Sequence, residues 1–243
     1  MTPLFRIILM EHIRSQRILI ELIIGAVMAF FVLRNLSDAQ AVHASLVLYA
    51  FLVSLYTTSV IADSSEQPHA IQRILALPTR HLLLQAIGVS VTTITIASYV
   101  VLVGVGMLLN PLAMPALLTL LLGLPSLLLL IVTAIVLMLL MTPLVASTTQ
   151  RIIILAIITV PMAWNIVVST VNLSMPFVDG TIVAAITTVW GILLWPSFAV
   201  YNHAIHPDYN ILTILLHLIH VCLLVGMAHV GRHWFAHKSL TIA

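Results

Sequence analysis

The sequence predicts an all-α polytopic membrane protein with six transmembrane helices and with both termini in the cytoplasm. Of its 243 residues, 62% are hydrophobic and only 7% are charged, and the mean hydropathy is +1.21. Soluble domains carry roughly 25% charged residues, so this chain lacks the polar side chains that would cover a water-exposed surface. Its apolar runs are long and continuous, which excludes the alternating strands of an outer-membrane barrel. Helices satisfy their own backbone hydrogen bonds in lipid, so we expect helical spans throughout.

Taken in order, the chain alternates a few polar stretches with long apolar runs. Residues 1–17 carry charged side chains scattered around the helical wheel, so we predict a cytoplasmic or interfacial segment without a clean amphipathic face. Six runs are long enough or nearly long enough to span: 18–33, 44–62, 82–109, 116–145, 152–172 and 211–230. The whole chain, 1–243, is therefore expected to form a single transmembrane domain.

A further apolar stretch lies within residues 173–210, between the fifth and sixth predicted spans. Its centre, 181–198, is nearly long enough to span, but Gly191 and Pro196 interrupt it. We predict a re-entrant element on the outer side of the membrane. With six spans, every basic residue except Arg34 lies inside, as the positive-inside rule requires. A seventh span at 181–198 would move Arg232 and Lys238 outside, so six spans are favoured.

Residues 63–81 form the longest polar interruption in the first half of the chain. Pro68 suits the first position of a helix and Pro78 ends one, which predicts a helix of about ten residues. Its apolar side chains fall on one side of the helical wheel, and His69, Gln72 and Arg73 fall on the other. Such a helix either lies at the lipid interface or docks into a groove on a soluble partner.

The same loop resembles the first cytoplasmic loop of ABC-2 type transporter permeases. The resemblance rests on Glu66, the short helix and the run Leu75-Ala76-Leu77-Pro78-Thr79-Arg80. It implies that the loop is a coupling helix that sits on a separate ATP-binding subunit. The residues to which it assigns this contact are Glu66, Pro68, Ile71, Arg73, Ile74, Leu75, Leu77, Pro78 and Arg80.

No catalytic motif supports an enzymatic function for this chain. A phosphate-binding G-x-x-x-x-G-K-[ST] loop does not occur, and the sequence contains a single lysine, Lys238. ATP and Mg²⁺ are therefore expected in a partner ATPase, with no cofactor or metal in this chain. The lone cysteine, Cys222, excludes an intramolecular disulfide. A net charge of +2 arises from very few charges and gives no sign of nucleic-acid binding.

Five polar side chains within the predicted spans are candidates for function. Glu21 either reaches the interface or pairs with Arg17, or else it contacts the ATPase or a gate. Trp164 and Asn165 follow Pro161 in the fifth span and either line a pathway or join helices. His217 and His220 in the last span either form hydrogen bonds between helices or bind a ligand. His43, His203 and His206 are expected outside the membrane.

Together these features predict the membrane subunit of an ABC exporter in a bacterial or archaeal plasma membrane. By the resemblance, it works as a dimer with itself or a sister chain and exports a hydrophobic or amphipathic cargo such as a lipid, drug, antibiotic or peptide. One alternative is a haem-exporter membrane subunit of cytochrome c maturation, which would give His217 and His220 a purpose. Another is a membrane anchor, sensor or immunity protein that binds a partner without moving cargo.

Overall fold

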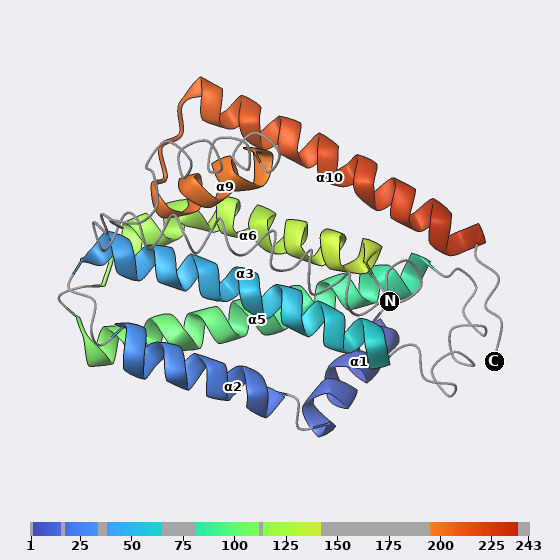
Figure 1. Ribbon diagram of the computed structural model, residues 1–243, viewed down its shortest axis with the longest axis horizontal. Coiled ribbons are helices and arrows are strands. Elements are labelled where there is room, and N and C mark those ends of the chain that lie inside the picture. Colours follow the sequence, from blue (N-terminus) through green and yellow to red (C-terminus); the bar gives the residue numbers. More distant parts are fainter. Residues whose placement is uncertain are drawn as a thin grey trace, which may run out of the picture.

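The computed structural model describes residues 2–15, 18–33, 38–64, 81–111, 114–141 and 195–237, and in these ranges the protein is built from helices without strands (Figure 1). The elements are α1 Thr2–Arg14, α2 Ile18–Val27, the π-helical segment η1 Met28–Leu33, α3 Ala39–Ser64, α5 His81–Leu109, α6 Leu117–Leu140, α9 Trp195–Ile205 and α10 Ile211–His237.

Four of these helices are long and apolar enough to cross a membrane. They are α3, α5, α6 and most of α10, the last over Ile211–His229. The predicted all-helical fold is thereby confirmed, and the four candidate membrane helices coincide with four of the six predicted spans. The first predicted span, 18–33, is formed by the 10 residues of α2 and the 6 of η1. At 1.5 Å per residue this is about 24 Å, shorter than the hydrocarbon core of a bilayer.

The spans run side by side, and α3 lies at the centre of the bundle (Figure 1). In its most apolar window 72% of the residues are buried, against 17% for α10 at the edge. Its Leu46, Val47 and Phe51 belong to the common core, which α5, α6 and α9 complete. The helices α2, α3, α5 and α6 alternate in direction, whereas α10 runs the same way as α6 (Figure 1).

The α3 helix begins earlier than the sequence predicts. We expected an outer loop as far as residue 43, but Asp38 caps a helix that starts at Ala39. The Asp38 carboxylate accepts hydrogen bonds from the backbone N–H groups of Gln40 and Ala41, at 3.2 and 3.3 Å. His43 consequently lies inside α3 and is buried. It was predicted as the last residue of a loop, and this boundary was wrong.

The α9 helix lies within the predicted re-entrant region, residues 173–210. Pro196, which was expected to interrupt the apolar stretch, lies in the first turn of α9, where its missing N–H has no intrahelical partner to lose. Residues 173–194 lie outside the described ranges. The helix itself packs against α3, α6 and α10 and buries Val200, Tyr201, Ala204 and Ile205.

The two terminal segments are more regular than predicted. Residues 2–14 form the helix α1, although the charge pattern shows no clean amphipathic face, because α1 packs on α5 and buries Ile8 and His12. At the other end, α10 continues to His237, beyond the predicted limit of the last span at residue 230. Figure 1 shows α1 and the end of α10 at the same end of the bundle.

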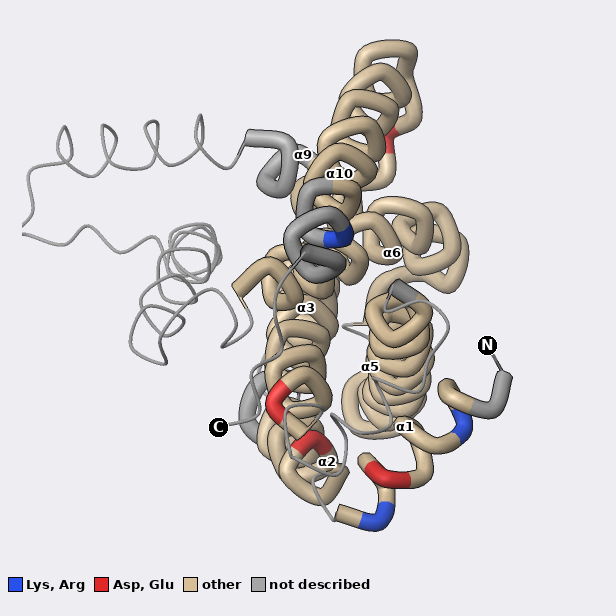
Figure 2. The backbone as a smooth tube through the Cα atoms, turned by 90° about the vertical axis from the view of Figure 1, so that its right-hand side faces the viewer, with Lys and Arg blue, Asp and Glu red and all other residues tan. Residues whose placement is uncertain are grey.

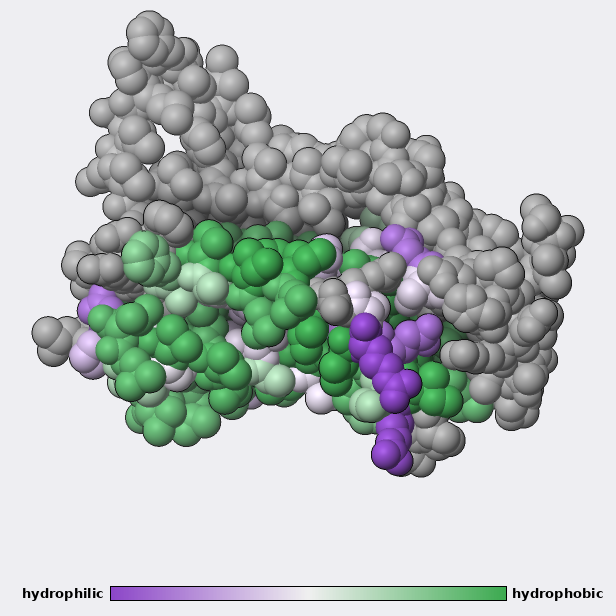
Figure 3. Space-filling view, turned by 90° about the horizontal axis from the view of Figure 1, so that it is seen from below, coloured by the Kyte–Doolittle hydropathy of each residue, from purple (hydrophilic) through white to green (hydrophobic). Residues whose placement is uncertain are grey.

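The surface agrees with a membrane environment. Seen from the side of α2, Figure 3 shows a broad hydrophobic face with hydrophilic side chains gathered towards the end where α1 lies. The large apolar side chains that α2 and the start of η1 expose are Leu19, Ile20, Leu22, Ile23, Ile24, Val27 and Phe30. Lipid tails are the solvent that such a face requires.

Candidate functional site

The predicted coupling residues, Glu66 to Arg80, lie outside the described ranges, but the two helices that hold the loop are defined. The α3 helix ends at Ser64 and α5 begins at His81, so the loop leaves and re-enters the bundle at the end where α1 lies (Figure 1). Figure 2 faces this end and shows the basic residues of α1 and α10 there. Among the described residues these are Arg6, Arg14 and Arg232. Trp164 and Asn165 also lie outside the described ranges.

His217 joins α10 to α6 with both ring nitrogens engaged. Its Nδ1 lies 2.7 Å from the carbonyl oxygen of Thr213, one turn earlier in α10. Because a carbonyl only accepts, Nδ1 carries a hydrogen and donates it. Its Nε2 lies 2.8 Å from the hydroxyl of Ser126 in α6, which donates to the neutral ring. Iron or another metal would therefore have to displace one of these bonds to bind His217.

His220 makes a second bond between the same two helices. Its Nε2 lies 2.7 Å from the hydroxyl of Thr133, and that hydroxyl also donates to the carbonyl oxygen of Leu129. A hydroxyl has one hydrogen, so the ring donates to Thr133 when Thr133 donates to Leu129. The Nδ1 atom of His220 is buried and has no partner among the described residues.

The two histidines therefore act as hydrogen-bonding side chains between helices, which is one of the two roles that the sequence allowed. No cluster of three or more histidine, cysteine, aspartate or glutamate side chains suited to a metal ion occurs within the described ranges. The bonds attach the exposed edge helix α10 to α6 at two levels. In lipid the hydrophobic effect does not drive helices together, so hydrogen bonds such as these two help to hold them in contact.

Other histidines gather where α3, α9 and α10 meet. The rings of His203 and His217 are 5.6 Å apart, and the side-chain amide of Gln40 lies 2.7 Å from Nε2 of His206. His203 lies in the short helix α9, where burial and the facing His217 lower its pKa. The lowered pKa favours the neutral form of His203.

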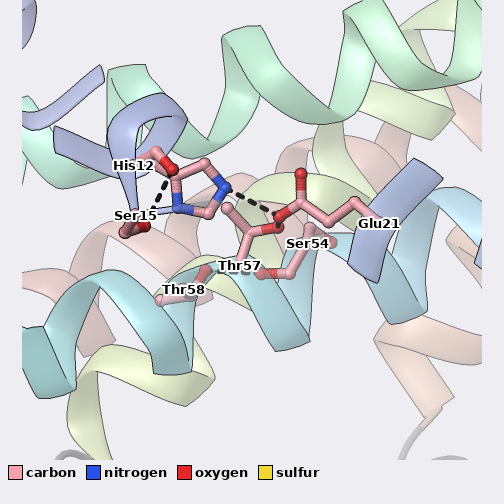
Figure 4. A network of polar contacts seen from close by, with 6 residues as sticks. All are labelled: His12, Ser15, Glu21, Ser54, Thr57 and Thr58. Carbon is pink, nitrogen blue, oxygen red and sulfur yellow. Dashed lines mark hydrogen bonds and ion pairs between the residues drawn. The ribbon is translucent and has the colours of Figure 1, made fainter. Parts of the chain in front are cut away.

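The sequence interpretation missed a polar contact that joins α1 to the first two spans. Nε2 of His12 lies 3.1 Å from Oε1 of Glu21, and the hydroxyl of Thr57 donates to the same oxygen (Figure 4). Glu21 is 1% exposed, so its side chain does not extend to the protein surface as snorkelling would require. Arg17, the predicted partner, lies outside the described ranges. Periodicity places residues within one helix, but this contact joins three separate helices.

The two carboxylate oxygens of Glu21 differ in their hydrogen bonding. Oε1 accepts two hydrogen bonds, while the buried Oε2 has no partner among the described residues. A buried carboxylate with a bare oxygen is costly unless a proton or a positive charge compensates it. His12 is the titratable side chain in contact with this carboxylate, at 3.1 Å.

A comparison with models of known protein families finds no matching family, and comparisons with curated proteins and with solved structures find no match either.

Proposed function

We propose that the chain is the membrane-spanning subunit of an ATP-driven exporter of the ABC-2 type. The observation that carries the proposal is the position of the two helix ends that flank residues 65–80. These ends, Ser64 and His81, lie at the end of the bundle that also holds α1 and the described arginines. By the positive-inside rule this end faces the cytoplasm, where an ATPase would reach the loop.

The direction of the helices supports the six-span topology. The parallel helices α6 and α10 are separated in sequence by residues 141–210, and α9 lies beside the start of both (Figure 1). An odd number of crossings is needed to connect the end of α6 with the start of α10. A single span at 152–172 meets this requirement and leaves both termini on the cytoplasmic side.

The composition of the described bundle supports a hydrophobic or amphipathic cargo. Its buried polar side chains are mainly hydroxyls, several of which bond to a carbonyl of their own helix, as Ser45, Thr58 and Ser90 do. Such a bundle has few charged groups to hold an ion or a sugar. Lipids, drugs, antibiotics and amphipathic peptides suit it better. A pathway would form between this chain and a second permease chain related to it by a two-fold axis.

Co-purification tests the partner. The tagged chain is extracted from its host in a mild detergent, and the associated chains and small molecules are identified by mass spectrometry. We expect a P-loop ATPase at one copy per permease chain. Its absence even after mild crosslinking would contradict the proposal and favour a protein that binds a partner without transport.

Substitution in the loop tests the coupling. In the purified complex, Ile74→Glu places a charge on the apolar side of the predicted helix, and Gln72→Glu places the same charge on its polar side. We expect Ile74→Glu to abolish the stimulation of ATP hydrolysis by lipids or drugs and Gln72→Glu to retain it. Equal stimulation in the two variants would show that the apolar side does not contact the ATPase.

A further inference from the structure

Three histidines recur along the end of α10, one in each turn. They are His229, His233 and His237, and the helix continues to the last of them. Four residues advance an α-helix by about 400°, so each of these positions lies about 6 Å further along the axis and about 40° further around it than the one before. The three positions therefore share one side of α10.

This side of α10 is open in the described part of the protein. His229 is exposed, and so is Cys222, which lies two turns earlier on the same side. Between these two residues, a β-carbon added at Gly226 would meet no atom within 4 Å. An ion from the surrounding water can therefore approach α10 at His229 without displacing another helix.

The row of histidines begins where the membrane-spanning part of α10 ends. The apolar stretch that is long enough to cross a membrane is Ile211–His229, and residues 230–237 extend the helix beyond it. These residues add about 12 Å to α10 at the end of the bundle where α1 lies (Figure 1). A metal ion is costly within hydrocarbon, but water can complete its coordination beyond the span.

The spacing of the three positions suits a metal ion that is held by two imidazoles. Two histidines four residues apart on one face of a helix bind a single ion in H-E-x-x-H zinc sites. Positions 229 and 233 form one such pair, and positions 233 and 237 form another. An ion centred between the first two positions lies about 9 Å along the axis from the third, so each ion is held by one pair. His233 belongs to both pairs.

We propose that the end of α10 is a binding site for one divalent transition-metal ion, such as Cu²⁺, Ni²⁺ or Zn²⁺, held by His233 together with His229 or His237 and completed by water. Imidazole is a preferred ligand of these metals, and Cu²⁺ binds most tightly among them. Two protein ligands make an exchangeable site, because structural zinc sites use four. The inference is independent of the exporter assignment, since it rests on α10 alone.

Spectroscopy with Cu²⁺ alone as the probe tests the proposal on the full chain in lipid nanodiscs. The affinity tag contains no histidine, and Cys222→Ser removes the exposed thiol. Electron spin echo envelope modulation counts the imidazoles that bind the copper ion, and competition with a chelator of known affinity gives the dissociation constant. We expect one Cu²⁺ per chain, coordinated by two imidazoles.

Substitutions of single histidines locate the ion. His233→Ala removes the position that both pairs share, so we expect the affinity to fall about tenfold or more and the modulation to report one imidazole. His229→Ala and His237→Ala each leave one pair intact and should keep the signal of two imidazoles. His206→Ala is the control, because it removes an exposed histidine that precedes α10 and should leave copper binding unchanged.

Three outcomes would overturn the proposal. The first is copper binding by His233→Ala that is as tight as in the unsubstituted protein, and the second is loss of the signal of two imidazoles in His206→Ala. The third is an unsubstituted chain that holds copper through a single imidazole or does not bind it. This last measurement needs no substitution, so it decides the question even if His233→Ala does not fold.

Discussion

Gly123 of α6 lies against the backbone carbonyl of Ala204 in α9, without room between them for a side chain. A β-carbon added at Gly123 would lie 2.5 Å from the Ala204 oxygen, which is backbone and cannot swing aside. Gly123→Ala should therefore destabilise the fold by about 1–3 kcal/mol through overpacking, measured as a loss of thermal stability in detergent. It should also loosen α9, which packs on α6 at this point.

Gly104 of α5 provides the matched control for Gly123. A β-carbon added there meets no atom within 4 Å. Alanine is a better helix former than glycine, so Gly104→Ala should stabilise the protein by up to about 1 kcal/mol. Equal stability of the two variants would show that α6 and α9 do not approach as closely as the structure has them.

Thr57 stabilises the bundle through its bond to Glu21. Thr57→Val keeps the shape of the side chain but removes one of the two donors to Oε1 of the buried carboxylate. We expect a loss of stability on the order of 1 kcal/mol, measured by thermal unfolding in detergent. Thr93→Val is the control, since exposed Thr93 bonds to the carbonyl of Val89 in its own helix and should change stability by about 0.5 kcal/mol or less. Equal losses in both variants would contradict a special role for the bond.

The spans were predictable because a spanning helix needs one long apolar run. Both ends of α5 and the start of α6 fall within one residue of the predicted positions, since few polar residues interrupt these runs. The ends of helices were less predictable where a capping residue determines them, as Asp38 determines the start of α3. An Asp three residues before a buried run is a usable N-cap signal, and reading it would have placed the start of α3 correctly.

Contacts between helices could not be predicted in the same way. The bond between residues 12 and 21 and the bond between residues 21 and 57 depend on how three helices pack, which periodicity within one helix does not contain. For His217 and His220 the sequence left two roles open, and it did not show that the hydroxyls of Ser126 and Thr133 lie on the facing helix. The sequence thus identified the polar residues within the apolar helices but not the residues to which they bond.

His220 and Thr133 should show a measurable energetic coupling. A double-mutant cycle with His220→Leu and Thr133→Val isolates the bond between α10 and α6. Bonds of this kind in membrane proteins contribute about 0.6 kcal/mol on average, and we expect a coupling of about that size from unfolding measurements. The same cycle with exposed His229→Leu in place of His220→Leu should give no coupling. A coupling of zero in both cycles would contradict the bond.

Asp38 should hold the first turn of α3 in place. Its carboxylate accepts from two backbone N–H groups of the first turn, those of Gln40 and Ala41. Asp38→Ala removes both bonds and should destabilise the protein by about 0.5–2 kcal/mol, whereas Asp38→Asn keeps an acceptor oxygen and should cost much less. Hydrogen exchange of the amides in residues 40–43 gives a local measurement, because fraying of the uncapped turn speeds exchange there and leaves the end of α3 at Ser64 unchanged. Faster exchange in both variants alike would show that the charge of Asp38, acting on the helix dipole, matters more than its hydrogen bonds.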